Sequence, residues 1–97
     1  MKEIDWLHIG LRLHDIRMQR KISAKRMTEL TGCSDTHLIN VEHNRSHMSL
    51  ENLVAVVIAL DVSLDYIVMG IRPLTNLTGL VFRSDDELEN NLMLTEE

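Results

Sequence analysis

Residues 22–45 read ISAKRMTELTGCSDTHLINVEHNR, and one short pattern occurs twice in this stretch. The pattern is an apolar residue, a serine, three further residues and a second apolar residue. It is found at Ile22-Ser23 to Met27, Cys33-Ser34 to Leu38, Met48-Ser49 to Leu53, and Val62-Ser63 to Ile67. A serine oxygen accepts hydrogen bonds from unpaired N–H groups in the first turn of a helix, and the flanking apolar pair fixes the direction of the chain. Each instance therefore predicts the start of a helix.

The first two helix starts are only eleven residues apart. The link Thr31-Gly32-Cys33 leaves room for a tight turn, and Gly32 stands where a left-handed residue commonly ends a helix. Two short helices joined by a glycine-bearing turn form the unit that places its second helix in the DNA major groove. The spacing therefore indicates DNA binding as well as a fold.

The apolar spacing predicts an all-α fold. The expected helices span residues 5–20, 24–31, 35–43, 50–60 and 64–69, and no strand signal interrupts them. The side chains expected to point inward are Leu7, Ile9, Leu13, Ile16, Met27, Leu30, Leu38 and Val41. The helix at 50–60 is almost uniformly apolar and is expected to form the buried centre. Asn44 is expected to take a left-handed conformation after the third helix. We therefore predict a compact five-helix domain over residues 1–73.

Arg72-Pro73 marks the boundary with a short C-terminal extension, residues 74–97. Leu77 to Phe82 is a short apolar stretch compatible with an extended chain. Ser84 to Glu87 fits a capping box, and Leu88 and Leu92 lie on one face of a predicted sixth helix. A helix of this length is marginal alone, so we expect it to pack on another copy of the chain or on the helix at 64–69. The alternative is a disordered acidic tail.

The composition excludes several classes of protein. The chain has 97 residues, is 44% hydrophobic and contains three aromatic residues, which suits one aliphatic core. A single cysteine cannot form an intramolecular disulfide. Residues 1–20 lack an apolar run of signal-peptide or membrane-span length, so a soluble cytoplasmic protein that does not enter a membrane is expected. Neither a nucleophile with its base nor a glycine-rich phosphate loop is visible, so catalysis and a cofactor are not expected.

Metal binding was considered for the side chains of Cys33, His37, His43 and His47. Cys33 belongs to a helix-start pattern and is expected to face inward. His37 and His43 are six residues apart, which places them on different faces of a helix. We therefore expect no metal site.

The net charge of −5 is not spread evenly. Residues 1–73 carry nine basic and nine acidic side chains, whereas residues 74–97 carry one basic and six acidic ones. The whole negative excess therefore lies in the extension. The stretch from Arg17 to Arg26 contains five basic residues and no acidic one. The local field near the two short helices can thus be positive although the total charge is negative.

Several segments of the chain together resemble a known family. They are Ile22-Ser23, Glu29 to Ser34, Val41-Glu42, Ser49 to Leu53, Ala59 to Asp65, and, in the first helix, Ile9-Gly10, Leu13 and Arg17. Over residues 4–70 these segments resemble the XRE family of phage-repressor and Cro-like helix-turn-helix regulators. The resemblance implies a five-helix domain, usually a homodimer, that binds double-stranded DNA and represses or activates transcription at paired half-sites. Such half-sites lie about one DNA turn apart, roughly 34 Å.

The resemblance also implies roles for individual residues. The helix at 24–31 becomes the positioning helix, and the helix at 35–43 the recognition helix. The base-facing positions are Asp35, Thr36, His37 and Asn40. The positions that face backbone phosphates are His43, Asn44 and Arg45, to which the basic stretch adds Arg20, Lys21, Lys25 and Arg26. Arg17 and Glu42 match a pair that forms an internal salt bridge in many members.

Three positions depart from the family pattern. Ala24 stands where glutamine often contacts DNA, and Thr28 stands where the family prefers a small alanine at the helix crossing. Asp35 places a carboxylate at the leading recognition position. A carboxylate accepts from cytosine N4 but is repelled by phosphate. These departures concern affinity and sequence choice rather than fold.

Some residues have a second interpretation. Asp35 would stabilise its helix through the dipole even without DNA. The basic stretch and the polar face of residues 35–43 are alternatively ordinary solvated surfaces. Ile39 either contacts a thymine methyl group or packs at the domain edge.

Two rival functions remain beside a DNA-binding repressor. In the first, an anti-repressor or antitoxin keeps the fold and binds a basic protein partner through its acidic tail. A ligand-sensing regulator is the second rival, but 24 residues after Pro73 are too few for a sensor domain.

Overall fold

The computed structural model describes residues 3–75 and 78–92, with side chains described as far as Asn90. The described part contains six helices and no strand. They are α1 (Trp6–Arg20), α2 (Ala24–Thr31), α3 (Asp35–Glu42), α4 (Leu50–Leu60), α5 (Leu64–Met69) and α6 (Asp85–Leu92). The all-α prediction is confirmed, and the first five helices match their expected ranges to within a residue at each end. Among the described residues no helix is long and apolar enough to cross a membrane.

The serine pattern is confirmed at all four helix starts. The Oγ atoms of Ser23, Ser34, Ser49 and Ser63 each accept from the backbone N–H three residues on, over 3.0–3.1 Å. Gly32 ends α2 in the left-handed region, with φ of 79°. Asn44 is also left-handed, with φ of 58°. It lies one residue beyond the C-cap His43.

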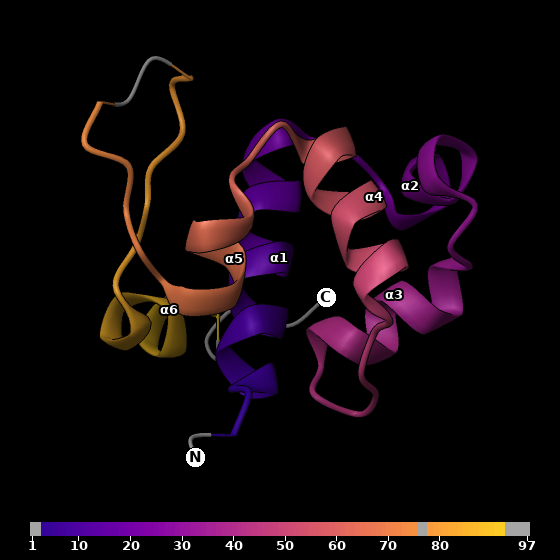
Figure 1. Cartoon of the computed structure of the whole chain (residues 1–97), viewed down its shortest axis with the longest axis horizontal. Coiled ribbons are helices and arrows are strands. Elements are labelled where there is room, and N and C mark those ends of the chain that lie inside the picture. Colours follow the sequence, from indigo (N-terminus) through magenta and orange to yellow (C-terminus); the bar gives the residue numbers. More distant parts are fainter. Residues whose placement is uncertain (1–2, 76–77, 93–97) are drawn as a thin grey trace.

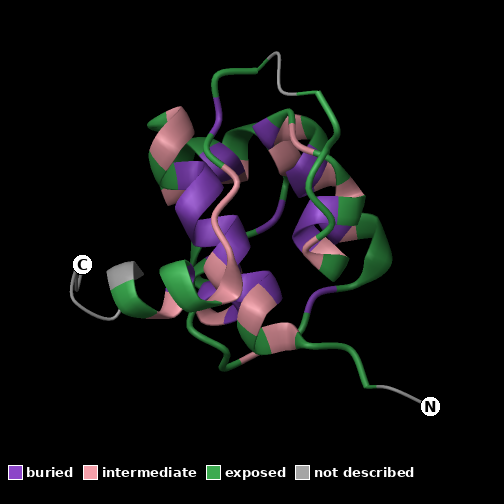
Figure 2. Cartoon of the chain, turned by 90° about the vertical axis from the view of Figure 1, so that its left-hand side faces the viewer, coloured by how far each residue is buried: buried purple, intermediate pink, exposed green. Residues whose placement is uncertain are grey.

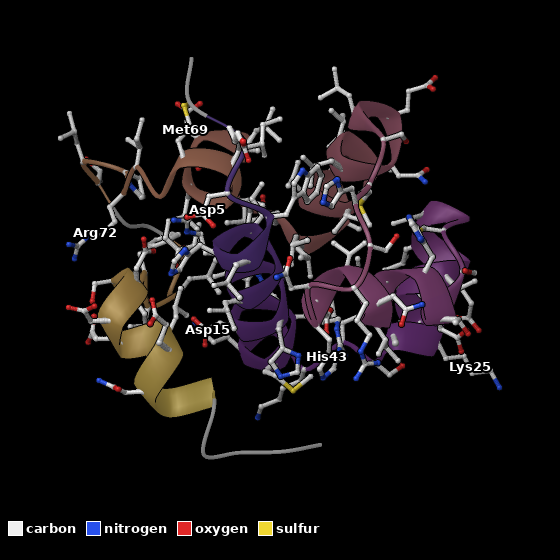
Figure 3. The ribbon with its side chains drawn as sticks, turned by 90° about the horizontal axis from the view of Figure 1, so that it is seen from below. Asp5, Asp15, Lys25, His43, Met69 and Arg72 are labelled. Atoms are coloured by element: carbon white, nitrogen blue, oxygen red, sulfur yellow. The ribbon has the colours of Figure 1, made fainter. Side chains whose placement is uncertain are left out.

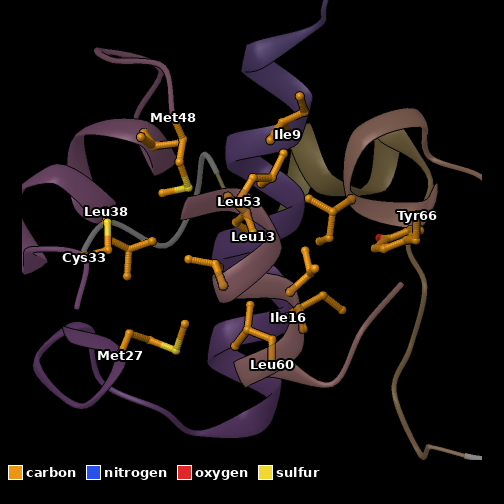
Figure 4. Close-up of a cluster of buried hydrophobic side chains, with 14 of the residues drawn as sticks. Ile9, Leu13, Ile16, Met27, Cys33, Leu38, Met48, Leu53, Leu60 and Tyr66 are labelled. Carbon is orange, nitrogen blue, oxygen red and sulfur yellow. The ribbon is translucent and has the colours of Figure 1, made fainter. Parts of the chain in front are cut away.

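Helix α1 is the centre of the arrangement and contacts α3, α4, α5 and α6 (Figure 1). Its buried Ile9, Leu13 and Ile16 form the middle of the core (Figure 4). The other helices contribute Met27, Leu38, Val41, Leu53, Val56, Val57, Leu60, Tyr66 and Ile67. The core is therefore aliphatic, with Tyr66 as its single fully buried aromatic side chain among the described residues.

Three of the expected inward positions are wrong. Leu7 and Leu30 are exposed, because each lies beside the apolar stripe of its helix and not on it. Helix α4 is not buried all round: Ile58 is 72% exposed. Only the side of α4 that carries Leu53, Val56, Val57 and Leu60 faces α1, so the opposite side meets solvent (Figure 2).

The extension returns along the outside of α1. Leu80 and Leu88 are buried, and the ring of Phe82 packs edge-on against Tyr66 with centroids 4.9 Å apart. The capping box is present, since Ser84 N donates to Glu87 Oε1 over 2.9 Å and Glu87 N to Ser84 Oγ over 3.3 Å. Ser84 N and the Ser84 side chain hold the pKa of Glu87 below its usual value. Leu77 lies outside the described residues, as does the side chain of Leu92.

The partner of α6 differs from both sequence-based expectations, because α6 packs on α1 of its own chain. One polar stripe of α1 makes this contact. His8 Nε2 lies 2.7 Å from Glu89 Oε2, and Arg12 Nη2 lies 2.9 Å from Asp85 Oδ1. Further along, Arg83 Nη1 donates to Asp15 Oδ1 over 2.6 Å, and Gln19 exchanges two hydrogen bonds with the backbone of Val81. Positions 8, 12, 15 and 19 share one helix face.

Candidate nucleic-acid interface

The site begins with the turn between α2 and α3. Thr31 Oγ1 accepts from the backbone N–H of Cys33 over 3.1 Å, and Ser34 caps the next helix at once. Cys33 is buried, and burial raises the pKa of its thiol. The turn is thus fixed by local hydrogen bonds and by one inward side chain, which holds α3 at a set angle to α2.

The outer face of α3 is polar. Leu38 and Val41 are buried, whereas Asp35 and Thr36 are exposed and His37 and Asn40 are half-buried. These four predicted base-facing residues therefore lie on the solvent side of the helix. The Asp35 carboxylate accepts from the backbone N–H of Thr36 over 2.8 Å, so it also caps its own helix. Ile39 is exposed at the edge of the same surface.

The basic stretch divides into two groups. Lys21, Lys25 and Arg26 are exposed, and Arg26 pairs with Glu29 over 2.9 Å. Arg20 is held elsewhere: its Nε donates to Leu60 O over 2.8 Å and its Nη2 to Asp61 O over 2.9 Å. Arg20 therefore ties the end of α1 to the end of α4.

The three residues after α3 are exposed and ordered by backbone hydrogen bonds. Asn44 N donates to Val41 O over 3.1 Å, and Arg45 N donates to Asn40 O over 2.8 Å. His43 Nδ1 lies 2.9 Å from Ile39 O. Figure 3 shows Lys25 of α2 and His43 after α3 pointing away from the core. Basic or polar groups therefore lie beside the polar face of α3 on both helices.

A buried ion pair joins α1 to α3. Arg17 Nε lies 2.7 Å from Glu42 Oε2, and Arg17 Nη2 donates to Glu42 Oε1 over 2.9 Å. Burial would raise the pKa of Glu42, but hydrogen bonds from Arg17 and then His14 outweigh it and hold that pKa below its usual value. Glu42 is therefore a buried carboxylate whose charge is matched.

Two members of this junction were not recognised in the sequence. His14 Nδ1 lies 2.8 Å from Glu42 Oε1. A Cβ on Gly10 would come within 2.4 Å of Val41 O, so only glycine allows α1 to meet the end of α3 so closely. The signal was the spacing of Gly10, His14 and Arg17 at i, i+4 and i+7, which places all three on one side of α1.

Two of the departures from the family pattern have local explanations. Thr28 Oγ1 donates to Ala24 O over 3.3 Å, so its hydroxyl is satisfied inside α2. Ala24 is partly buried and packs against the core. Near the other end of α3, the rings of Trp6 and His47 stack with centroids 4.8 Å apart. This stack ties the link before α4 to the start of α1.

The side chains considered for a metal are not brought together. Within the described residues, the one group with suitable spacing is Asp5, His8 and Asp85, not Cys33 and the histidines near α3. Asp5 Oδ2 lies 2.6 Å from His8 Nδ1, and Asp85 is bound by Arg12. Ion pairs within the chain account for this group.

The comparisons with known proteins agree with this geometry. A family model described as helix-turn-helix matches residues 13–67, which is more than half of the chain. No curated protein matches. A solved structure that resembles the chain is the restriction-modification controller protein C.AhdI from Aeromonas hydrophila, with a TM-score of 0.62 and 25% sequence identity. The likeness covers 65% of this chain and 96% of that one. The chain therefore belongs to the XRE-type helix-turn-helix family and is a DNA-binding transcriptional regulator.

Proposed function

We propose that the chain is a sequence-specific repressor that reads the DNA major groove with α3. The observation that carries the proposal is the polar outer face of α3, with exposed cations beside it on α2 and after α3. The base-contacting residues in this proposal are Asp35, Thr36, His37 and Asn40. Bound over a promoter, such a protein excludes other proteins from the same groove. The proposal involves no catalytic step and places the protein in the cytoplasm, where bacterial DNA lies.

Phosphate contacts would supply most of the affinity. Lys21, Lys25, Arg26, His43, Asn44 and Arg45 are exposed for this role. Arg20 reaches a phosphate only through Nη1, since its other guanidinium nitrogens donate to α4 carbonyls. The acidic helix α6 lies across α1 from α3 (Figure 1). Its charges are therefore remote from the proposed phosphate contacts, and the positive local field near α2 and α3 can act.

A homodimer belongs to the same proposal, because paired half-sites need two recognition helices. The surface best suited to the second copy is an apolar hollow of about 240 Å³ lined mainly by α1, α4 and α5 side chains. Ile4, Leu50 and Met69 are exposed at its rim, and Asp65 is the single charged residue in its lining. Exposed apolar patches of this kind commonly mark protein contacts.

The rival proposal, a protein-interaction module that binds a basic partner through the acidic tail, has less support. Asp85 is bound to Arg12 and Glu89 to His8 within the chain, which leaves fewer carboxylates of α6 for a partner. The polar face of α3 would also have no role in it.

The deciding experiment is selection of the full chain against a random duplex pool, followed by titration at several salt concentrations. We expect an enriched sequence with two related half-sites and a log affinity that falls linearly with log salt. If no member of the pool binds in a salt-sensitive manner, the DNA-reading proposal is wrong. Sedimentation of the free protein and of Leu50→Asp over a concentration series tests the dimer surface, with exposed Leu74→Asp as the matched control.

A further inference from the structure

His14 contributes to the buried junction from the middle of α1. Its side chain is 11% exposed, and its Nδ1 donates to Glu42 Oε1 over 2.8 Å. Arg17 already gives Glu42 two hydrogen bonds and a full positive charge. Neutralising Glu42 therefore does not require His14, and another reason is needed for a histidine at this position.

The His14 ring also faces the ring of His43, the residue that ends α3. The two centroids are 6.5 Å apart and the planes are tilted by 59°. A carbonyl oxygen can only accept, so His43 Nδ1 carries the proton that it shares with Ile39 O. Nε2 is then the His43 ring nitrogen left for an external partner. The His43 ring is thus fixed at one edge by its own helix and limited on another side by His14.

The three α1 residues at this junction do different things. Gly10 sets how closely the backbones of α1 and α3 approach. Arg17 matches the charge of Glu42. His14 alone of the three combines a bond to Glu42 with a ring contact to the exposed residue beyond it.

We infer that His14 is a positioning residue for DNA binding, which holds the His43 ring so that Nε2 meets a backbone phosphate. The inference rests on the proposed function. His14 is too buried to touch DNA itself, so its effect passes through His43 and the turn that continues to Arg45. It fixes one phosphate contact and has no part in base recognition.

The test compares the full-length wild type with His14→Gln and His14→Ala. A glutamine amide can still donate to Glu42 but offers no ring to His43, so this variant separates the two contacts. The matched control is His8→Gln, because His8 is also a carboxylate-bound histidine of α1, 15% exposed, but on the face that meets α6. Each protein is titrated with the selected duplex over a salt series, and circular dichroism checks that it is folded.

Both His14 variants should bind about tenfold more weakly, as for loss of one well-placed contact, and should flatten the salt slope by up to about 0.9 units. His8→Gln should bind like wild type. His43→Ala should reproduce the loss, and His14→Ala combined with His43→Ala should bind no more weakly than His43→Ala, because one contact cannot be lost twice. Wild-type affinity and slope in folded His14→Gln would overturn the inference, as would additive losses in the double variant.

A second measurement needs no DNA. The Hε1 proton signal of His43 in the free protein should move in His14→Gln and stay in place in His8→Gln. An unmoved signal in His14→Gln overturns the inference even if DNA binds. If the wild type binds no duplex of the pool, the proposed function fails, and the His43 signal alone then decides whether His14 sets this ring.

Discussion

Arg12 of α1 and Asp85 at the start of α6 form an ion pair 2.9 Å long, with the arginine almost fully buried and the aspartate half exposed. Arg12 Nη1 also donates to Ile67 O over 3.0 Å, so one guanidinium joins α1, α5 and α6. The Cβ of any residue replacing Gly70 would come within 2.8 Å of Arg12 Nη2. The arginine is therefore enclosed, and its charge depends on Asp85.

Replacing Asp85 with asparagine should destabilise the fold by about 1–3 kcal/mol, because a buried guanidinium loses its charged partner. Urea melts measure this change. Asp86→Asn is the matched control, since Asp86 lies in the same helical turn but is exposed. Equal melting midpoints for the two variants would mean that the ion pair contributes nothing beyond the helix dipole.

The pair of Arg17 and Glu42 should behave as one unit. Either Arg17→Met or Glu42→Leu alone leaves a buried charge without its main partner and should cost about 3–5 kcal/mol. The double variant should cost less than the sum of the two. Denaturant melts of all four proteins form the cycle. Simple additivity would show that the two side chains do not stabilise each other.

The bridge from His8 to α6 should depend on pH. Burial alone would lower the pKa of His8, but the carboxylates of Glu89 and Asp5 raise it above the ordinary value of 6.5. A raised folded-state pKa means that the bridge stabilises fully below 6.5 and that this contribution is lost as pH rises through the folded value. The stability difference between wild type and His8→Gln, about 1–2 kcal/mol at its largest, should therefore shrink as pH rises. A difference that grows with pH would contradict the assignment.

The local features of the fold were predictable because their cause lies within a few residues. A serine three residues before a free N–H caps a helix wherever it occurs, and the turn at Gly32 needs only its own neighbours. Apolar spacing was less exact. Leu7 and Leu30 sit one position away from the stripe that meets another helix, and spacing alone does not define where that stripe ends.

The contact between α1 and the extension could not be predicted in the same way. His8, Arg12, Asp15 and Gln19 have the spacing of an ordinary solvated face, and their partners lie more than sixty residues away in the chain. Polar residues reveal no partner by their pattern, because burial depends on what covers them. His14 went unrecognised for the same reason, while Arg17 and Glu42 were found through the family resemblance.

Burial of Leu88 should make the extension part of the cooperative unit. Leu88→Ala removes a fully buried side chain and should cost about 2–5 kcal/mol. Leu74→Ala is the matched control, since Leu74 is fully exposed in the same extension and should change stability little. Melts followed by tryptophan fluorescence report unfolding at Trp6, which belongs to α1. An unchanged midpoint in Leu88→Ala would show that the extension does not stabilise the helical domain.

Lys25 and Asn40 should separate affinity from sequence choice. Lys25→Ala should weaken binding to all duplexes alike and reduce the salt slope by up to about 0.9 units, because a phosphate contact carries no sequence information. Asn40→Ala should instead relax the preference at one base pair by about 1–3 kcal/mol and leave the slope unchanged. Arg72→Ala is the control for lost positive charge, since Arg72 is exposed and Figure 3 shows it on the other side of the molecule from Lys25. A uniform loss in Asn40→Ala, with no change of preference at any position, would remove this residue from base recognition and restrict the reading of sequence to the first turn of α3.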